Sequence, residues 1–184
     1  EIQSSKLSFN DFTGMSIKDS ELENIMFTDT ILNNAKFINC ELLSIPFRYL
    51  YMVGVSFEKS DIDDTLYYKN MMGEAIFNNT KIHDCKFKHN DISDGKFNSS
   101  KLNDIQMSDC IMKNNSFVNT NIIYSNFNNC DFSNSNFSNS HIGKVNFNEC
   151  VFNNCDFSNV TIVGSNIKRS MLINNNCVDN LRIY

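Results

Sequence analysis

A large apolar residue returns every five positions along almost the whole chain. Stepping in fives from Ile2, every position up to Leu172 is Ile, Leu, Phe, Met or Tyr, which makes 35 consecutive positions without an exception. Fifteen of the 16 Phe residues fall on this register. Such a period matches neither an α-helix, at about 3.6 residues per turn, nor a strand that alternates at about 2. It indicates short extended segments that turn a corner after each one.

The residue two positions before each large apolar residue is expected to face the interior as well. Side chains two apart in an extended segment point to the same side. These positions mainly hold small or compact residues, which include Ala35, Cys40, Val55, Ala75, Thr80, Cys85, Gly95, Cys110, Cys130, Val145, Cys150 and Cys155. One large and one small inward residue in each segment predict a filled, narrow core.

Residues 20 positions apart resemble each other, and this sets the number of segments in one full turn. The column from Ile2 to Ile162 contains only Ile and Leu, and the column from Phe37 to Phe157 contains only Phe. Four segments therefore make one coil. We predict an all-β fold, a quadrilateral parallel β-helix of about nine coils, roughly 43 Å long at about 4.8 Å per coil. Asn and Ser are expected at the corners, where they accept turn backbone angles.

Several segments resemble the pentapeptide-repeat family, whose motif is a small residue, Asp or Asn, Leu or Phe, and two polar residues. The best matches are "CDFSN" at 130–134 and 155–159, "SNFSN" at 135–139 and "VNFNE" at 145–149. The resemblance covers essentially the whole chain and implies a right-handed quadrilateral β-helix, in agreement with the columns. It does not fix a function, because this fold serves several roles.

The outward positions stop being polar between Glu41 and Ile76. The apolar residues there are predicted to bind a partner and are Leu43, Tyr49, Tyr51, Val53, Leu66, Tyr68 and Met71. Stacking by 20 places Ile31, Tyr51 and Met71 in one outer column. A patch rich in Tyr and Met on an otherwise polar protein is typical of a binding surface. Two alternatives remain: a bulge around Pro46 tucks these side chains inward, or a neighbouring domain covers them.

Acidic residues gather in the same part of the chain. The predicted acidic patch consists of Glu21, Glu23, Glu41, Asp61, Asp63 and Asp64. Glu21, Glu41 and Asp61 are expected to stack in one outer column. Some members of the pentapeptide-repeat family imitate DNA with an acidic stripe and bind topoisomerases. Here the column turns to Lys81 and Lys101, so a solvated face is the favoured interpretation.

We predict neither a catalytic residue nor a metal ligand among the His residues, and no cofactor. His83, Cys85 and His89 have the side chains that ligate zinc. Cys85 lies on the inward register and His83 on the outward one, so their ligand atoms are expected to diverge. His141 has no evident acid to orient it as a general base.

The seven Cys residues are an odd number without disulfide spacing, and reduced thiols are expected. Cys110, Cys130 and Cys150 are 20 apart and are predicted to pack in one inner column as small apolar residues. Cys177 takes a central position where the pattern decays, but its neighbours supply no base that would activate it as a nucleophile. An enzyme confined to this segment is disfavoured.

The domain prediction is one β-helix over 1–176, followed at 177–184 by a cap or the entry to a further domain. The repeat already runs at Ile2 and "CVDNLRIY" breaks its register, so we expect a fragment of a larger protein. Long Asn-rich segments with Phe centres are similar to the β-helical part of effectors injected by pathogenic bacteria. Those effectors include HECT-like E3 ubiquitin ligases, whose catalytic lobes follow the β-helix.

That similarity implies a non-catalytic module that recognises a host protein. The module would belong to an effector that the bacterium secretes into the host cytoplasm. If the protein is not such an effector, we expect it in the bacterial cytoplasm. A formal net charge of −5 disfavours nucleic acid as a partner. No apolar run approaches the roughly 20 residues that cross a bilayer, so membrane insertion is not expected. A topoisomerase-binding DNA mimic and a passive structural spacer are the alternative functions.

Overall fold

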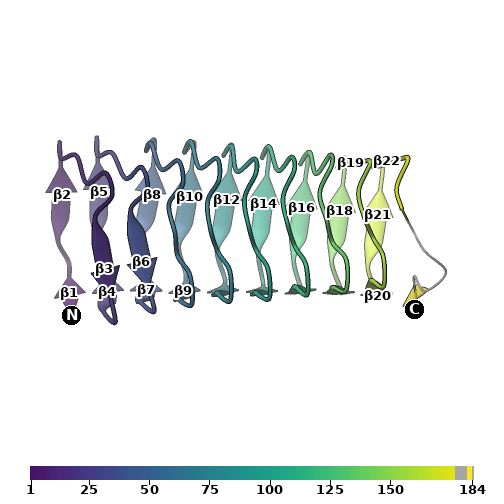
Figure 1. Ribbon diagram of the computed structural model, residues 1–184, viewed down its shortest axis with the longest axis horizontal. Helices are drawn as coiled ribbons and strands as arrows, with labels where there is room; N and C mark the ends of the chain where they lie inside the picture. The colour runs from purple at the N-terminus through teal and green to yellow at the C-terminus, as the bar shows by residue number, and fades with distance from the viewer. Residues whose placement is uncertain (177–181, 184) are drawn as a thin grey trace.

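The structure, a computed structural model, describes residues 1–176 and 182–183. The chain forms a parallel β-solenoid of about nine coils that stack along one axis, with the first and last strands at opposite ends (Figure 1). The predicted all-β fold, with coils of 20 residues, is confirmed. The described residues contain no helix, and therefore none that is long and apolar enough to span a membrane.

Each coil has four faces, which we name A to D in chain order, so that face A is opposite face C. Face A is a parallel ten-stranded sheet. Its strands are β1 (Ile2–Gln3), β4 (Glu21–Glu23), β7 (Glu41–Leu43), β9 (Asp61–Asp63), β11 (Lys81–His83), β13 (Lys101–Asn103), β15 (Asn121–Ile123), β17 (His141–Gly143), β20 (Thr161–Val163) and β23 (Arg182–Ile183).

Face B is a parallel nine-stranded sheet. Its strands are β2 (Lys6–Ser8), β5 (Met26–Thr28), β8 (Pro46–Arg48), β10 (Leu66–Tyr68), β12 (Lys86–Lys88), β14 (Gln106–Ser108), β16 (Asn126–Asn128), β18 (Asn146–Asn148) and β21 (Asn166–Lys168). Faces C and D are joined mainly by single β-bridges. They also hold two short strand pairs, β19 (Val151–Asn153) with β22 (Met171–Ile173) on face C and β3 (Ser16–Lys18) with β6 (Lys36–Ile38) on face D.

The register follows the predicted step of 20, so that Ile82 pairs with Leu102 and Phe127 with Phe147. The last pair departs from it, because Thr161 pairs with Arg182, a separation of 21. Most of the segment predicted as a cap or the entry to a further domain, 177–184, lies outside the described residues, as does Cys177.

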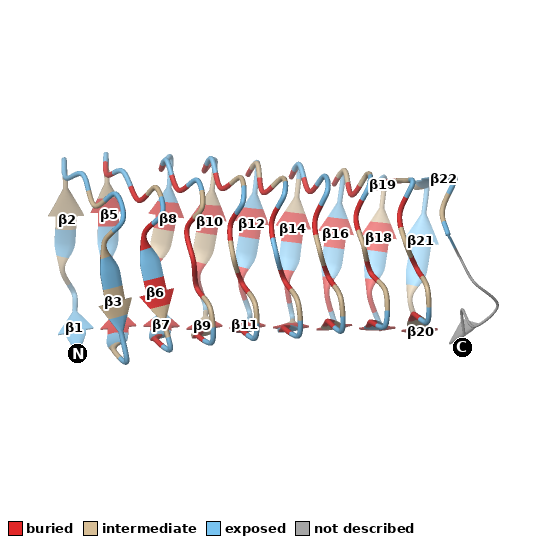
Figure 2. Ribbon diagram, viewed as in Figure 1, coloured by how far each residue is buried: buried red, intermediate tan, exposed pale blue. Residues whose placement is uncertain are grey.

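The core is built from stacked aromatic columns. From Phe37 to Phe157 neighbouring rings on face D are parallel, with centroids 5.3 to 4.7 Å apart. Figure 2 shows the central residue of each strand buried in the middle coils and the flanking residues exposed or intermediate. Close packing of this kind maximises both apolar burial and favourable aromatic contact.

The small inward companions are buried, as predicted, and the polar ones bond the backbone of the preceding coil. The Ser60 hydroxyl accepts a hydrogen bond from the Cys40 N–H at 3.1 Å and donates one to the Phe37 carbonyl at 2.9 Å. The Asn70 side chain likewise accepts a hydrogen bond from the Leu50 N–H and donates one to the Phe47 carbonyl, at 2.9 Å each. These side chains satisfy buried backbone groups at the corners, where the sheet ladder is interrupted.

Each corner places one residue in the left-handed backbone region. The position is mostly Asn, Asp or Ser, with φ between 47° and 61° at residues such as Asp64 and Asn139. Asn and Asp tolerate this region better than most side chains. Side-chain ladders connect these corners, as where Asn129 donates to Asp109 at 2.8 Å. Phe9, the one Phe outside the five-residue register, lies at a corner and is 81% exposed.

Candidate protein-docking surface

An apolar surface covers parts of faces B and C in the second to fourth coils. Tyr49 is 64% exposed, Tyr51 56% and Met71 52%, although most outward positions elsewhere carry polar side chains. We call this set the apolar surface, and its members are Met26, Ile31, Pro46, Tyr49, Tyr51, Val53, Leu66, Tyr68 and Met71. Six of the seven residues predicted as partner-binding therefore lie together on two adjoining faces.

Leu43 is the predicted residue that lies elsewhere. It ends β7 on face A, between Glu23 and Asp63 in register, and it is 40% exposed. Tyr51 and Val53 are close to Leu43 in the chain but belong to face C, on the opposite side of the coil. Leu43 is therefore part of the acidic face and is not in contact with the apolar surface.

Pro46 does not create a bulge that buries these side chains. Pro46–Arg48 forms the regular strand β8, which pairs residue for residue with β10. Pro46 lacks the N–H that Met26 and Lys86 donate to the preceding coil at the equivalent positions, and β5 and β8 pair only at Phe27 and Phe47, whereas the pairing with β10 stays complete. The face C column is also regular, because Ile31 bridges to Tyr51 and Tyr51 to Met71. The predicted outer column of these three residues is confirmed.

The corner between faces B and C holds an aromatic cluster. The rings of Tyr49 and Tyr68 meet edge to face, with centroids 5.3 Å apart and planes at 87°. The Lys69 ammonium lies 5.8 Å from the centroid of the Tyr49 ring and 5.3 Å from that of Tyr68. Tyr68 also contacts His89, with ring centroids 5.8 Å apart. Cation–π attraction and edge-to-face packing hold these side chains in place without burying them.

A groove of about 320 Å³ runs beside this cluster. It is lined by Met26, Phe27, Thr28, Asp29, Pro46, Arg48 and Tyr49. Met26, which is 49% exposed, forms part of the apolar surface and was not singled out from the sequence. The signal was present, because positions 26, 46 and 66 form one outer column and all three are apolar.

The six predicted acidic residues lie together on face A and its corner with face B. Glu21 pairs in register with Glu41, and Glu41 with Asp61. The acidic column ends at Lys81, whose ammonium makes an ion pair with Asp61 at 2.8 Å. This ion pair raises the pKa of Lys81, mainly through the hydrogen bond to Asp61.

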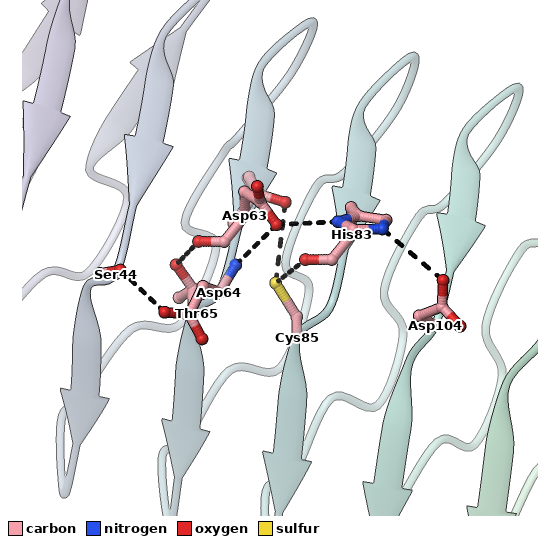
Figure 3. A network of polar contacts seen from close by, with 8 residues as sticks. Ser44, Asp63, Asp64, Thr65, His83, Cys85 and Asp104 are labelled. Atoms are coloured by element: carbon pink, nitrogen blue, oxygen red, sulfur yellow. Dashed lines mark hydrogen bonds and ion pairs between the residues drawn. The ribbon is translucent and has the colours of Figure 1, made fainter.

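His83 joins three coils at the edge of the acidic face (Figure 3). Its Nδ1 lies 2.9 Å from Asp63 Oδ1 and its Nε2 lies 3.6 Å from Asp104 Oδ2. The hydrogen bond to Asp63, and then the nearby carboxylate charges, raise the pKa of His83. Asp64 is held separately, since its carboxylate accepts a hydrogen bond from the Ser44 hydroxyl at 2.9 Å.

The side chains of His83 and Cys85 diverge as predicted. Cys85 is buried, and its thiol donates to the His83 carbonyl at 3.1 Å rather than facing the imidazole. Burial raises the pKa of Cys85 to about 12. In the described part of the chain no group of three or more His, Cys, Asp or Glu residues is arranged to hold a metal ion.

The predicted inner column of Cys110, Cys130 and Cys150 is present and buried, and the described cysteines are all free thiols. Hydrogen bonding to the neighbouring thiols, together with burial, raises the pKa of Cys130. Burial also raises the pKa of Cys155 to about 11. Cys130 and Cys155 are therefore poor nucleophiles. Hydrogen bonding to Cys130 lowers the pKa of Cys110 and of Cys150, but both thiols are buried in the core column, where they contribute packing.

Comparison with known proteins finds matches to a repeat family and to solved structures. Residues 80–151 match the family described as pentapeptide repeat region. No curated protein sequence matches the chain. The fold is similar to that of HetL, a pentapeptide repeat protein involved in heterocyst differentiation regulation from the cyanobacterium Nostoc sp. strain PCC 7120. The TM-score is 0.56 at 11% identity, over 95% of this chain and 86% of HetL.

The fold is also similar to that of trypsin-treated QnrB1, a plasmid-mediated fluoroquinolone resistance protein. The TM-score is 0.52 at 16% identity, over 93% of this chain and 88% of QnrB1. At such identities the likeness concerns the fold alone. Residues 80–151 match the pentapeptide repeat region, and the coils described on both sides of them continue the same solenoid.

Proposed function

We propose that this chain is a non-catalytic protein-interaction module that docks a folded partner through the apolar surface. The observation that carries the proposal is the grouping of nine apolar side chains on two adjoining faces of a polar solenoid, six of them exposed and Pro46, Leu66 and Tyr68 half-buried. Exposed groups of Tyr and Met residues are typical of protein-binding sites, where they become the buried anchors of the interface.

The solenoid backbone supports this role because it holds the surface in one shape. Tyr51 lies in a continuous bridge column, and the N–H of Met52 donates to the Met71 carbonyl at 2.8 Å. Because the backbone groups are hydrogen-bonded between coils, the backbone at this surface has little conformational freedom to lose when a partner binds. A rigid surface therefore binds with a smaller entropy cost than a flexible loop of the same composition.

Photocrosslinking tests the proposal. A photoreactive phenylalanine analogue replaces Tyr51 in one variant and Ile111 in a matched control. Both positions lie in the same exposed column of face C, but Ile111 lies outside the apolar surface. We expect a saturable crosslink to one protein at position 51 and none at position 111. Identical crosslinked species at both positions, or none at position 51, would rule out this surface.

We further propose that the module acts in a bacterial effector that enters the host cytoplasm and recognises a host protein there, for example in a HECT-like ubiquitin ligase. The support is the Asn-rich surface and Phe-rich core that the chain has in common with the β-helical part of such effectors. A bilobal catalytic region after Tyr184 in the whole protein, with transfer of ubiquitin to the crosslinked partner, would support this setting. A protein that is not exported and stays in the bacterial cytoplasm would contradict it.

DNA mimicry is the second candidate, because six carboxylates lie on and beside face A. The column of Glu21, Glu41 and Asp61 covers two steps of about 4.8 Å. This is the length of about three phosphate-to-phosphate steps on one DNA strand, at about 3.4 Å each. Lys81 then neutralises Asp61. Salt-sensitive binding to a purified topoisomerase that is lost when Glu41→Lys and Asp61→Lys are combined would favour mimicry over docking at the apolar surface.

A further inference from the structure

Four cationic side chains lie around the aromatic cluster at the corner of faces B and C, and none of them is paired with an acidic side chain of the described residues. Arg48 and Lys88 flank Tyr68 in register, Lys86 follows Leu66, and Lys69 lies at the corner. We call Arg48, Lys69, Lys86 and Lys88 the cationic group. Such a group is notable in a chain whose formal net charge is −5.

The cationic group and the groove form one continuous area. Arg48 lines the groove together with Met26, Pro46 and Tyr49. Lys69 rests against the rings of Tyr49 and Tyr68, so its ammonium stands beside the same walls. The groove is lined by one cation, Arg48, and one carboxylate, Asp29, and the ammonium of Lys69 beside the Tyr49 ring adds a second positive charge. A ligand that enters the groove therefore meets apolar walls and an excess of positive charge.

We propose that this area recognises an acidic segment of a partner protein that also carries a large apolar anchor. The anchor enters the groove between Met26 and Tyr49, and neighbouring carboxylates pair with Arg48 and Lys69. Arg is suited to this task because its guanidinium makes two parallel hydrogen bonds to a carboxylate. The inference rests on the proposed docking function and specifies the chemistry of the partner.

A polyanion such as single-stranded nucleic acid fits this area less well. Asp64 and Asp84 lie at the corner of faces A and B, two residues before Leu66 and Lys86, so an extended anion would approach like charges. The rings of Tyr49 and Tyr68 stand at 87° to each other and offer no common plane on which successive bases could stack. A short acidic segment with an apolar anchor avoids both difficulties.

Fluorescence anisotropy with synthetic peptides tests the inference on the full chain. The probe repeats Asp-Glu-Phe-Gly three times. Three comparison peptides replace the acids by Asn and Gln, replace them by Lys and Arg, or replace Phe by Ser. We expect the acidic Phe peptide to bind at least about tenfold more tightly than each of the others, because it alone supplies both charge and anchor. Its affinity should fall in about 1 M salt, where the Debye length is about 3 Å.

Charge reversal locates the site. Combining Arg48→Glu with Lys69→Glu should weaken binding of the acidic Phe peptide by about tenfold or more. The control combines Lys36→Glu with Lys96→Glu, two exposed cations of face D, and changes the net charge by the same amount. The control should bind like the unmodified chain. Equal losses in both double variants would overturn the inference, because they would report net charge rather than a site.

Three other results would also overturn it. These are absence of binding, equal binding of the Ser peptide, and binding of oligo-dT as tight as that of the acidic Phe peptide. If the peptides fail while position 51 still crosslinks a protein partner, the docking function stands and only the proposed chemistry is wrong. If position 51 crosslinks nothing and the peptide nevertheless binds at Arg48 and Lys69, a peptide site exists without docking on face C.

Discussion

At the scale of single residues, Tyr67 is the main irregularity of the core. It occupies the centre of the face B column between Phe47 and Phe87, is fully buried, and its hydroxyl has no hydrogen-bond partner. Burial raises the pKa of Tyr67 well above its usual value, so the phenol stays neutral. A neutral hydroxyl without a partner still costs free energy relative to an apolar ring.

The substitution Tyr67→Phe is expected to raise the free energy of unfolding by about 1 kcal/mol, because it removes an unpaired hydroxyl and leaves the ring stack intact. Phe47→Tyr is the matched reverse change in the same column and should lower it by about 1 to 3 kcal/mol. Urea unfolding of both variants provides the measurement. A Tyr67→Phe variant that is less stable than the unmodified chain would mean that the hydroxyl has a partner.

His83 gives the chain a small dependence of stability on pH. Its pKa is raised in the folded state, mainly by Asp63, from the ordinary value of 6.5. The stabilisation is therefore fully present below the unfolded pKa and is lost as the pH rises through the folded pKa. Because both side chains are half exposed, less than about 1 kcal/mol is expected.

NMR titration of His83 checks this account. Asp63→Asn should lower the pKa of His83, because it removes both the charge-assisted hydrogen bond and a neighbouring charge. Asp84→Asn changes the net charge equally but makes no hydrogen bond to the ring, so its effect should be smaller. Equal effects of the two substitutions would show that the general acidic field, rather than the Asp63 contact, controls His83.

At the scale of the elements, the inward polar residues do more than fill space. Asn70 bonds the Leu50 N–H and the Phe47 carbonyl, and its own N–H donates to Asn90 Oδ1 at 2.9 Å. Adjacent coils are therefore joined at the corner by side chains as well as by strands. The corner would otherwise bury backbone groups without partners.

Asn70→Ala should lower the free energy of unfolding by about 2 to 4 kcal/mol, because two buried backbone groups lose their partners. Asn70→Ser should recover much of this loss, since Ser60 makes both equivalent bonds two faces away. Thermal or urea unfolding measures the difference. If alanine and serine destabilise the chain equally, the lost contribution is packing volume and not hydrogen bonding.

At the scale of the whole molecule, the fold could be predicted from the sequence because each coil repeats the same packing problem. The repeated step of 20 residues, from Phe37 to Phe57 and onward, predicts both the strand register and the number of residues in a coil. The faces of the candidate site were also encoded, but Leu43 was grouped with Tyr51 by nearness in the chain. Residues that are near each other in the chain are spread over the four faces of a coil, whereas positions 20 apart lie side by side on one face.

The remaining features of the site could not be read from the pattern. The groove beside Tyr49 depends on the side-chain directions of Met26 and Arg48, and the position of Lys69 depends on how two tyrosine rings turn toward each other. Rotamers at exposed positions are set by local contacts and not by the repeat. The cationic group, in contrast, follows from the step of 20 once faces are compared.

The central claim is that the exposed apolar surface, and not the solenoid in general, binds a protein. The most direct test is the dissociation constant of the purified partner crosslinked at position 51, measured for Tyr51→Asp combined with Met71→Asp. We expect binding to weaken by at least about a hundredfold, since replacing a hot-spot residue of an interface costs about 2 kcal/mol or more. Ile111→Asp, in the same column, should leave the dissociation constant unchanged. Unchanged binding by the double variant, with its circular dichroism spectrum intact, would contradict the account.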